Sequence, residues 1–419
     1  MQTSLSAMFL QSTAGKAADE ILRNCVHCGF CNATCPTYQL TGDELDGPRG
    51  RIYLIKQVLE GHTPSARTRL HLDRCLTCRA CETTCPSGVD YHRLLETGRQ
   101  VIQETVTRPR AQTLLRWALR KVLTRRSLFR LLLLPGQWLR PLLPAPLRGK
   151  IPPRVRRRPA ANRARHARRM LLLDGCVQPV LAPQINQATH RVLDALGIST
   201  LVASGSGCCG ALSHHLEATD EALRFMRANI DAWWPEIEAG AEAIVITASG
   251  CAPQVKDYGR LLADDTAYAA RAARVSELAR DLSEVIAGES TYERLATLPR
   301  PVQVAFHSPC TLQHAQQING VVEDLLQRSG YTLLPVAEAH LCCGSAGTYT
   351  ILQPEIAAQL RTRKLAALQA HSPAVIATAN IGCLTHMANH ARAPVKHWIE
   401  LLEPLIPRNP DHGRISPAD

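Results

Sequence analysis

The sequence predicts an α + α/β chain, in which a mainly helical, cysteine-rich first part precedes a tandem pair of α/β units. Two observations carry this prediction. In the first hundred residues, cysteines recur at short, identical spacings among few strand-like segments. Further along, short apolar runs alternate with helical patterns, and cysteines follow the runs, which is typical of parallel α/β units. Both patterns occur twice, so each part of the chain contains a repeat.

The composition is that of a folded protein with aliphatic cores. The chain has 419 residues, of which 45% are hydrophobic but only 4% are aromatic. This length predicts two or three domains and excludes both a disordered chain and a small disulfide scaffold. The first twenty residues lack the basic and apolar regions of a secretory signal. We therefore expect a reducing, cytoplasmic compartment, where 16 cysteines indicate metal ligands or redox chemistry.

The first eight cysteines form two blocks with the same spacing, C-x2-C-x2-C-x3-C-P, displaced by 50 residues. This is the spacing of two-cluster bacterial ferredoxins, in which the fourth cysteine of each block ligates the cluster of the other block. The first predicted [4Fe–4S] cluster is held by Cys25, Cys28, Cys31 and Cys85, and the second by Cys75, Cys78, Cys81 and Cys35. Two zinc sites are the alternative, but a zinc site needs no third cysteine at this spacing.

The segment between the two blocks is expected to form a turn at Gly47–Gly50 and a helix at Ile52–Leu59. Glycines near a cluster permit a close backbone approach, and amide donors to its sulfurs raise its reduction potential. We expect a helical ferredoxin-type domain over residues 1–106.

The other eight cysteines form a longer repeat with offsets of 132 to 134 residues. The first unit holds Cys176, Cys208, Cys209 and Cys251, and the second holds Cys310, Cys342, Cys343 and Cys383. Both vicinal pairs continue as Cys-Cys-Gly. These thiols are predicted to bind a further cluster, while a redox dithiol and a purely structural role are the alternatives.

Strand-like runs precede cysteines of this repeat, and helical patterns lie between them. The expected strands are Met170–Leu173, Ala243–Thr247, Val302–Phe306 and Val375–Thr378, and the expected helices include Asp220–Glu238, Gly320–Arg328 and Pro354–Gln369. Ligands of parallel sheets gather at the carboxyl ends of the strands, where these cysteines fall. The expected units span residues 169–298 and 299–407, and a tail follows at 408–419.

A basic, proline-rich linker is expected over residues 107–168. From Arg108 to Arg169 the chain carries 19 of its 48 Lys and Arg residues and no acidic residue. Within it, Leu114–Leu134 resembles a basic amphipathic helix that lies on an anionic membrane surface. Docking to a partner subunit is the alternative, and no nucleic acid is expected because no aromatic stacking platform accompanies the charge. The apolar run Leu131–Leu147 contains Arg140 and four prolines, so we expect no transmembrane helix.

Motifs for organic cofactors are missing from the sequence. No G-x-G-x-x-G follows a strand, and neither a Walker A sequence nor a G-x-S-x-G elbow occurs. No catalytic residue is therefore predicted, and electrons must enter and leave through partners. Histidines near the cysteines are expected to donate hydrogen bonds rather than to ligate metal. They are His27, His307, His314, His340 and His386.

Together these motifs resemble the iron–sulfur subunits of glycolate oxidases. The matching segments are CVHCGFCNATCPTYQL at 25–40, GDELDGPRGRIYLIKQVLEG at 42–61, CLTCRACETTCPSGV at 75–89, NIDAWWPEIEAGAEAI at 229–244, LCCGSAGTYT at 341–350 and TANIGC at 378–383. The resemblance implies a complex with two flavin-domain subunits that bind FAD and oxidise glycolate to glyoxylate. It implies that this chain passes the electrons to the membrane quinone pool and is peripheral on the cytoplasmic side of the inner membrane.

The Cys-Cys-Gly units also resemble those of heterodisulfide reductases, whose motif ends in C-x2-C. Here Gln254 and His386 stand three residues after Cys251 and Cys383, so each unit has four cysteines rather than five. A thiol–disulfide reductase with reactive, low-pKa thiols is one alternative function. The other is an iron–sulfur subunit of an L-lactate or anaerobic glycerol-3-phosphate dehydrogenase, because the flavin subunit chooses the substrate.

Overall fold

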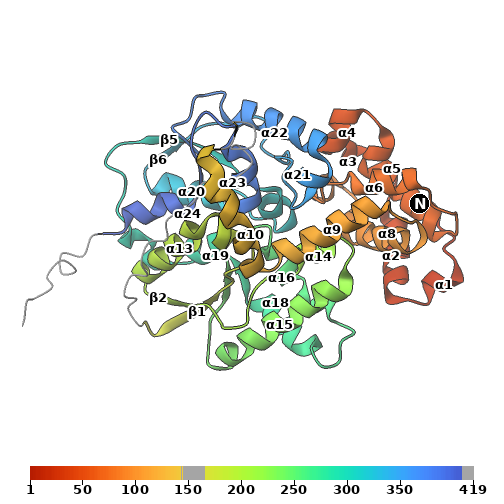
Figure 1. The fold of residues 1–419 in the computed structure, drawn as a ribbon, viewed down its shortest axis with the longest axis horizontal. Helices are drawn as coiled ribbons and strands as arrows, with labels where there is room; N and C mark the ends of the chain where they lie inside the picture. Colours follow the sequence, from red (N-terminus) through yellow and green to blue (C-terminus); the bar gives the residue numbers. More distant parts are fainter. Residues whose placement is uncertain (143, 145–165, 408–419) are drawn as a thin grey trace, which may run out of the picture.

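The computed structural model describes residues 1–142, 144 and 166–407. Part of the expected linker, at 143 and 145–165, and the expected tail at 408–419 lie outside the described residues. Figure 1 shows the helical first part at one end of the molecule, beside two units in which helices surround short strands. The predicted α + α/β fold class is confirmed.

The first part is built from helices that alternate with the cysteine loops. They are α1 Ala7–Leu10, α2 Thr13–Asn24, α3 Phe30–Ala33, α4 Pro36–Thr41, the 3-10 turn η1 Glu44–Asp46, α5 Pro48–Leu59, α6 Ala66–Asp73, α7 Ala80–Thr84 and α8 Tyr91–Thr105. Leu22, Ile55 and Leu94 are fully buried where α2, α5 and α8 pack together. Gly98 permits this packing, because a Cβ atom there would lie 2.6 Å from Cγ1 of Ile55.

The expected turn at Gly47–Gly50 is wrong, because α5 already begins at Pro48. Gly47 is the N-cap of this helix, which therefore starts four residues before the expected Ile52–Leu59. Proline is favourable in the first turn of a helix, where its missing N–H has no intrahelical acceptor. Gly50 is needed for space, since a Cβ atom there would lie 2.2 Å from the carbonyl oxygen of Glu44.

Each α/β unit is built on a parallel sheet, and the two described sheets share one topology. The strand orders are β2-β1-β3-β4 and β6-β5-β7-β8. The strands are β1 Arg168–Leu172, β2 Ile198–Leu201, β3 Ile244–Ile246 and β4 Ala279–Asp281 in the first unit, and β5 Val302–His307, β6 Tyr331–Leu333, β7 Val375–Thr378 and β8 Val395–His397 in the second. The repeat of cysteines is therefore also a repeat of structure.

Helices cover both sheets and include the three long helices expected from the sequence, now α15, α20 and α22. The first unit contains α12 Gln178–Leu181, α13 Pro183–Ala195, α14 Ala211–His215, α15 Thr219–Glu238, α16 Ala252–Lys256, α17 Tyr258–Leu261, α18 Ala269–Leu278, α19 Leu282–Ala287 and the turn η3 Ser290–Arg294. The second contains η4 Thr311–Ala315, α20 Val321–Arg328, α21 Tyr349–Leu352, α22 Pro354–Leu368, α23 Ile381–Ala388, α24 Ile399–Leu402 and η5 Glu403–Leu405. One apolar core, which includes Val245, Ile286, Val304 and Trp398, runs through both units.

The amphipathic helix expected at Leu114–Leu134 is in fact two helices. They are α9 Arg110–Leu123 and α10 Arg126–Leu139, and the turn η2 Arg140–Leu142 follows. Pro135 lies inside α10, although a proline usually ends or kinks a helix. None of the described side chains of α10 is buried, so water can solvate the carbonyl group that loses its hydrogen bond. Among the described helices, none is long and apolar enough to cross a membrane.

Candidate metal centres

Both ferredoxin-type loops have the same unusual backbone. Positive φ angles occur at His27 (57°) and Gly29 (86°) in the first loop, and at the equivalent Thr77 (52°) and Arg79 (62°) in the second. These conformations turn the chain so that the cysteines of C-x2-C-x2-C surround one centre. Three of the four residues are not glycine, and such strain is typical of ligand sites. The backbone N–H of Thr77 donates to Sγ of Cys75 over 3.5 Å.

The first group of thiols combines three cysteines of the first block with one of the second. Cys25, Cys28, Cys31 and Cys85 line a shared cavity of about 30 Å³. Burial, and then the neighbouring thiols of Cys25 and Cys85, raises the pKa of Cys31 to about 11. A metal centre binds the thiolate and displaces this proton, so four converging thiols fit a metal cluster.

The second group is the reciprocal one. Cys35, Cys75, Cys78 and Cys81 line a cavity of about 20 Å³. The hydroxyl group of Tyr91 donates to Sγ of Cys75 over 3.6 Å. Burial raises the pKa of Cys78 and of Cys81 well above the ordinary value of a thiol. The two cavities thus bring the eight cysteines close together, with Cys81 lining both of them, and the division into two ligand sets stays a prediction.

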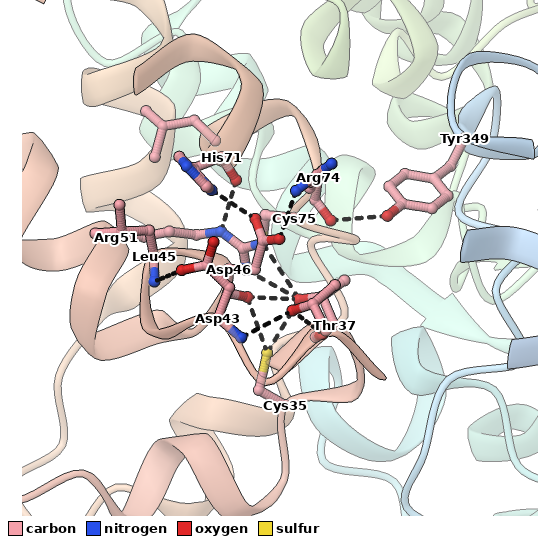
Figure 2. A network of polar contacts seen from close by, with 12 residues as sticks. Cys35, Thr37, Asp43, Leu45, Asp46, Arg51, His71, Arg74, Cys75 and Tyr349 are labelled. Atoms are coloured by element: carbon pink, nitrogen blue, oxygen red, sulfur yellow. Dashed lines mark hydrogen bonds and ion pairs between the residues drawn. The ribbon is translucent and has the colours of Figure 1, made fainter. Parts of the chain in front are cut away.

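A buried ionic network lies behind the second group (Figure 2). Asp46 is fully buried and accepts a hydrogen bond from Arg74 over 2.7 Å. Its other carboxylate oxygen lies 2.8 Å from Nδ1 of His71 and 3.7 Å from the guanidinium of Arg51. Arg51 is only 1% exposed, so Asp46 supplies the counter-charge that a buried guanidinium requires. Sequence analysis missed this network, because the residues are far apart in the chain and follow no period.

Thr37 connects the network to the second group of thiols. Its hydroxyl donates to the carbonyl oxygen of Asp46 over 2.7 Å and accepts from Arg51 over 3.2 Å. The same hydroxyl lies 3.3 Å from Sγ of Cys35. The position of this sulfur is therefore fixed by hydrogen bonds that end at a buried charge pair, as Figure 2 shows.

The glycine of each Cys-Cys-Gly motif has a steric reason. Gly210 and Gly344 have φ angles of 89° and 88°, which side chains rarely adopt. A Cβ atom on Gly344 would also lie 2.7 Å from the carbonyl oxygen of Ala357. In this conformation the glycine N–H donates over 3.4 Å to the first sulfur of the motif, on Cys208 or Cys342.

The four cysteines of the first α/β unit lie together. Cys208 is hydrogen bonded to Cys176 and Cys209, and Cys209 is also hydrogen bonded to Cys251. These hydrogen bonds, first that from Cys208, lower the pKa of Cys209. Cys208 and Cys209 are each only 3% exposed, whereas Cys176 and Cys251 are partly exposed. The burial of the low-pKa thiol of Cys209 disfavours a reductase that acts on protein disulfides.

The four cysteines of the second unit lie together as well. The sulfurs of Cys310 and Cys342 are 3.9 Å apart, and Cys343 is hydrogen bonded to both Cys342 and Cys383. Cys310 follows β5 and Cys383 follows β7, and these two strands pair in parallel up to His307 opposite Thr378. The thiols therefore lie at the carboxyl edge of the sheet, as expected.

The helical first part docks on the second unit close to the second ferredoxin-type group. The hydroxyl of Tyr349 donates to the carbonyl oxygen of Arg74 over 2.8 Å (Figure 2). Thr83 is hydrogen bonded to Nδ1 of His314 over 2.9 Å.

This docking brings two sets of cysteines close together. Cys78 of the second ferredoxin-type group and Cys310 and Cys342 of the second unit belong to one apolar cluster with the buried side chain of Leu76. No periodic signal in the sequence predicts such a contact between residues more than 200 positions apart.

The first ferredoxin-type group, in contrast, lies at the molecular surface. Cys28 is exposed, and its neighbours Val26 and Phe30 are 68% and 62% exposed. The ring of Tyr53 is also exposed and packs edge-on against His27. Exposed apolar side chains around a redox site are typical of a contact surface for a protein partner.

Two of the histidines near the cysteines form hydrogen bonds to the backbone, as expected. Nε2 of His314 donates to the carbonyl oxygen of His340 over 2.8 Å. Nε2 of His386 donates to the carbonyl oxygen of Ala357 over 3.1 Å. His307 differs, because neither of its ring nitrogens has a hydrogen-bond partner in the described part of the chain.

The comparisons with known families agree with this arrangement. Residues 21–89 match the 4Fe-4S dicluster domain family, and residues 170–256 and 304–388 match the cysteine-rich domain family. Fold and thiol groups thus define an iron–sulfur protein with one dicluster domain and two cysteine-rich domains. The glycolate oxidase iron-sulfur subunit of Escherichia coli (strain K12) is 55% identical over 97% of this chain and 99% of its own length. The chain belongs to the family of glycolate oxidase iron–sulfur subunits.

Further relatives are more distant. The probable glycolate oxidase iron-sulfur subunit of Bacillus subtilis (strain 168) is 32% identical over 87% of this chain and 88% of its own length. Lactate utilization protein A of Exiguobacterium sp. is 25% identical over 54% of this chain and 94% of its own length. A crystal structure of a hypothetical protein from Helicobacter pylori has a TM-score of 0.56 at 9% identity, covering 94% of this chain and 73% of that chain. This last similarity concerns the fold alone.

Proposed function

We propose that the chain carries electrons in a complex that oxidises glycolate to glyoxylate. It accepts electrons from FAD in two partner subunits and passes them to a membrane acceptor such as quinone. The observation that carries this proposal is the placement of the two thiol groups. One group lies at an exposed apolar surface, while the other contacts the second α/β unit. The 55% identity to a glycolate oxidase subunit supports glycolate rather than L-lactate as the substrate of the complex.

The proposed ligands are the two sets of four cysteines. Cys25, Cys28, Cys31 and Cys85 hold the first [4Fe–4S] cluster, and Cys75, Cys78, Cys81 and Cys35 hold the second. When bound, such a cluster accepts and releases one electron at a time. The protein contributes the thiolates, the donors to sulfur from Thr77 and Tyr91, and a fixed position for Cys35.

The partners supply the rest of the reaction. Oxidation of glycolate to glyoxylate removes two electrons and two protons, and two one-electron sites match the two electrons. We assign no acid–base residue to this chain, so the protons leave through the flavin subunits and the chain is not active alone. The surface around Cys28, with Val26 and Phe30, is where we expect the flavin subunit to dock.

We further propose that α9 and α10 attach the chain to the inner membrane. Their outward faces carry Leu114 (64% exposed), Trp117 (50%), Leu131 (64%), Leu132 (56%) and Trp138 (70%). Apolar side chains on helices that are rich in Arg and Lys favour an anionic bilayer surface. This attachment is peripheral, since neither of the two helices is long and apolar enough to span the bilayer.

Several basic residues of these helices form ion pairs within the protein. Arg116 pairs with Glu217 over 2.9 Å, and both Arg120 and Lys121 pair with Glu221, over 2.9 and 3.1 Å. These contacts hold α9 against the first α/β unit and leave the apolar face outward. These ion pairs support the view that α9 is packed on the first α/β unit and is not a free linker in solvent.

Serine substitution of one ligand in each set tests the relay. In the reconstituted complex, Cys28→Ser and Cys78→Ser should block reduction of a quinone analogue but leave reduction of the flavin by glycolate intact. Thr63→Ser, at an exposed position between the two cysteine blocks, is the matched control and should keep both reactions. Loss of flavin reduction in the cysteine variants, or normal quinone reduction, would contradict the relay. L-lactate in place of glycolate should give no flavin reduction.

A further inference from the structure

The second α/β unit contains a buried histidine that its hydrogen bonds do not explain. His307 ends β5 and is 2% exposed, and neither of its ring nitrogens has a hydrogen-bond partner in the described residues. A buried polar group without a partner costs free energy, so such a group in a native protein calls for an explanation. A ring nitrogen of His307 and the sulfurs of Cys343 and Cys383 all lie within 4.8 Å of one another. The unpartnered imidazole therefore faces thiols.

A buried cation lies near the same thiols. Lys364, on α22, is 2% exposed and donates to the carbonyl oxygen of Glu338 over 2.7 Å. Its ammonium group interacts electrostatically with Cys343, Cys342 and Cys383. Its other charged neighbour is Glu338, whose carboxylate is already paired with Arg363. A buried lysine is stabilised by negative charge, and thiolates bound to a metal cluster would supply that charge on the side of Cys343.

The first unit lacks both features at the equivalent positions. Leu173 stands where the second unit has His307, because each lies three residues before the first cysteine of its unit. Helices α15 and α22 align through the residues that crowd the motif glycines, Ala222 and Ala357. Seven residues after these alanines come Asn229 and Lys364. Asn229 is satisfied by the carbonyl oxygen of Cys208 over 2.8 Å and needs no charged partner.

We propose that the second unit binds an iron–sulfur cluster through Cys310, Cys342, Cys343, Cys383 and the imidazole of His307. With His307, the second unit supplies five cluster ligands. Its four cysteines alone supply one fewer than the five-cysteine motif of heterodisulfide reductases. The first unit, with Leu173, offers only its four thiols. One of the unpartnered nitrogens of His307 and the charge of Lys364 both find their partner in this cluster.

The place of this site in the molecule gives it a role. Cys310 and Cys342 lie in one apolar cluster with Cys78, which belongs to the second ferredoxin-type group, and interact electrostatically with it. The proposed cluster therefore lies beside the inner end of the relay, and this role rests on the proposed function. The presence of metal in the second unit does not rest on it and can be measured separately.

Metal content of the full chain, purified anaerobically, tests the site. We expect about twelve or more iron atoms per chain, of which about eight belong to the ferredoxin-type clusters. Cys343→Ser should lose about four iron atoms and the matching sulfide while the visible spectrum of the other clusters persists. Cys209→Ser, the equivalent change in the first unit, is the matched control and should keep the iron of the second. Unchanged iron in Cys343→Ser, or zinc in place of iron, overturns the proposal.

Spin-echo spectroscopy of the reduced protein, labelled with ¹⁵N-histidine, tests the ligand itself. The wild type should show a hyperfine coupling to one histidine nitrogen, and His307→Leu, which copies the residue of the first unit, should lose it. His307→Cys should retain wild-type iron without the nitrogen coupling, which separates ligation from folding. A bound cluster without nitrogen coupling, or a coupling that survives in His307→Leu, overturns His307 as a ligand.

The two proposals fail in different ways. If the ferredoxin-type clusters are missing from the wild type, the proposed electron transfer fails. If about eight iron atoms are present and Cys343→Ser changes none of them, only the site in the second unit fails.

Discussion

At the scale of single residues, Asp46 balances the charge behind the second ferredoxin-type site. It is fully buried and pairs with Arg74 over 2.7 Å, while the buried Arg51 lies 3.7 Å away. We expect Asp46→Asn to lower the free energy of unfolding by about 3–5 kcal/mol, because it leaves a buried guanidinium without its counter-charge. Anaerobic urea unfolding of the cluster-loaded chain measures the change.

Asp43→Asn is the matched control for this prediction. Asp43 belongs to the same loop and lies close to Asp46, and its carboxylate accepts a hydrogen bond from the N–H of Leu45 over 2.9 Å. Asparagine keeps an oxygen that can accept this hydrogen bond, so the substitution should cost less than about 1 kcal/mol. Equal destabilisation by the two substitutions would show that Asp46 is not the charge partner of Arg51.

The sequence identifies the cysteines well and their neighbours poorly. The grouping of Cys35 with the second block follows from spacing, because spacing alone determines which thiols one loop can bring together. The role of Tyr349 could not be predicted, since its hydrogen bond to Arg74 joins residues 275 positions apart. His307 belongs between these cases: its position near Cys310 is visible in the sequence, but the lack of a hydrogen-bond partner appears only in the fold.

At the scale of elements, periodicity predicted the long helices better than their ends. The buried faces of α15 and α22 repeat every three or four residues, so both helices could be found. The break between α9 and α10 and the proline inside α10 could not, because an exposed helix tolerates a lost hydrogen bond that a buried one does not. Pro48 begins α5 instead of a turn for a different reason, because the first turn of a helix has no intrahelical acceptor for the N–H that proline lacks.

The exposed face of α10 gives the prediction that belongs to this scale. We expect the triple variant Leu131→Ser, Leu132→Ser and Trp138→Ser to bind vesicles of phosphatidylethanolamine and phosphatidylglycerol at least about tenfold more weakly. The reason is the loss of apolar area that the bilayer would cover, since all three side chains are more than half exposed. Vesicle sedimentation of the full chain measures the affinity.

The control replaces exposed apolar residues elsewhere. Val202→Ser and Ile351→Ser alter side chains that are 43% and 48% exposed on the α/β units, and should leave vesicle binding unchanged. If the α10 variant binds vesicles normally but no longer assembles with the flavin subunits, this face docks a partner instead.

At the scale of the whole molecule, the ferredoxin-type groups and the cysteines of the two α/β units are neighbours in a series. Cys78 contacts the second unit, and the loops that carry the last cysteines of the two units touch each other. There the N–H of Ser249 donates to the carbonyl oxygen of Ala379 over 3.1 Å. In the first unit, Asp174 forms an ion pair with Arg126 of α10, close to Cys176. The fold thus lines up the cysteine groups between the exposed Cys28 and the proposed membrane face.

This order depends on how the two α/β units are held together, and His397 is part of that joint. His397 ends β8 in the second unit and is fully buried. Its Nε2–H donates to the carbonyl oxygen of Thr247 in the first unit over 3.0 Å, while Nδ1 accepts from the N–H of Ile399 over 3.3 Å. Both nitrogens are satisfied in the neutral ring, and burial lowers the pKa of His397 to about 4.

The lowered pKa makes the stability of the joint depend on pH. In the unfolded chain a histidine titrates near pH 6.5, so between about pH 6.5 and 4 the unfolded state binds a proton that the folded state does not. His397 therefore contributes its full stability above pH 6.5 and loses it as the pH falls, by about 2 kcal/mol at pH 5. Urea unfolding at pH 5, 6 and 7 should show a smaller loss of stability at low pH in His397→Gln than in the wild type.

The exposed His371→Gln, in the same unit, should keep the wild-type dependence of stability on pH. Equal slopes in wild type and His397→Gln would mean that the joint is not held by a neutral histidine.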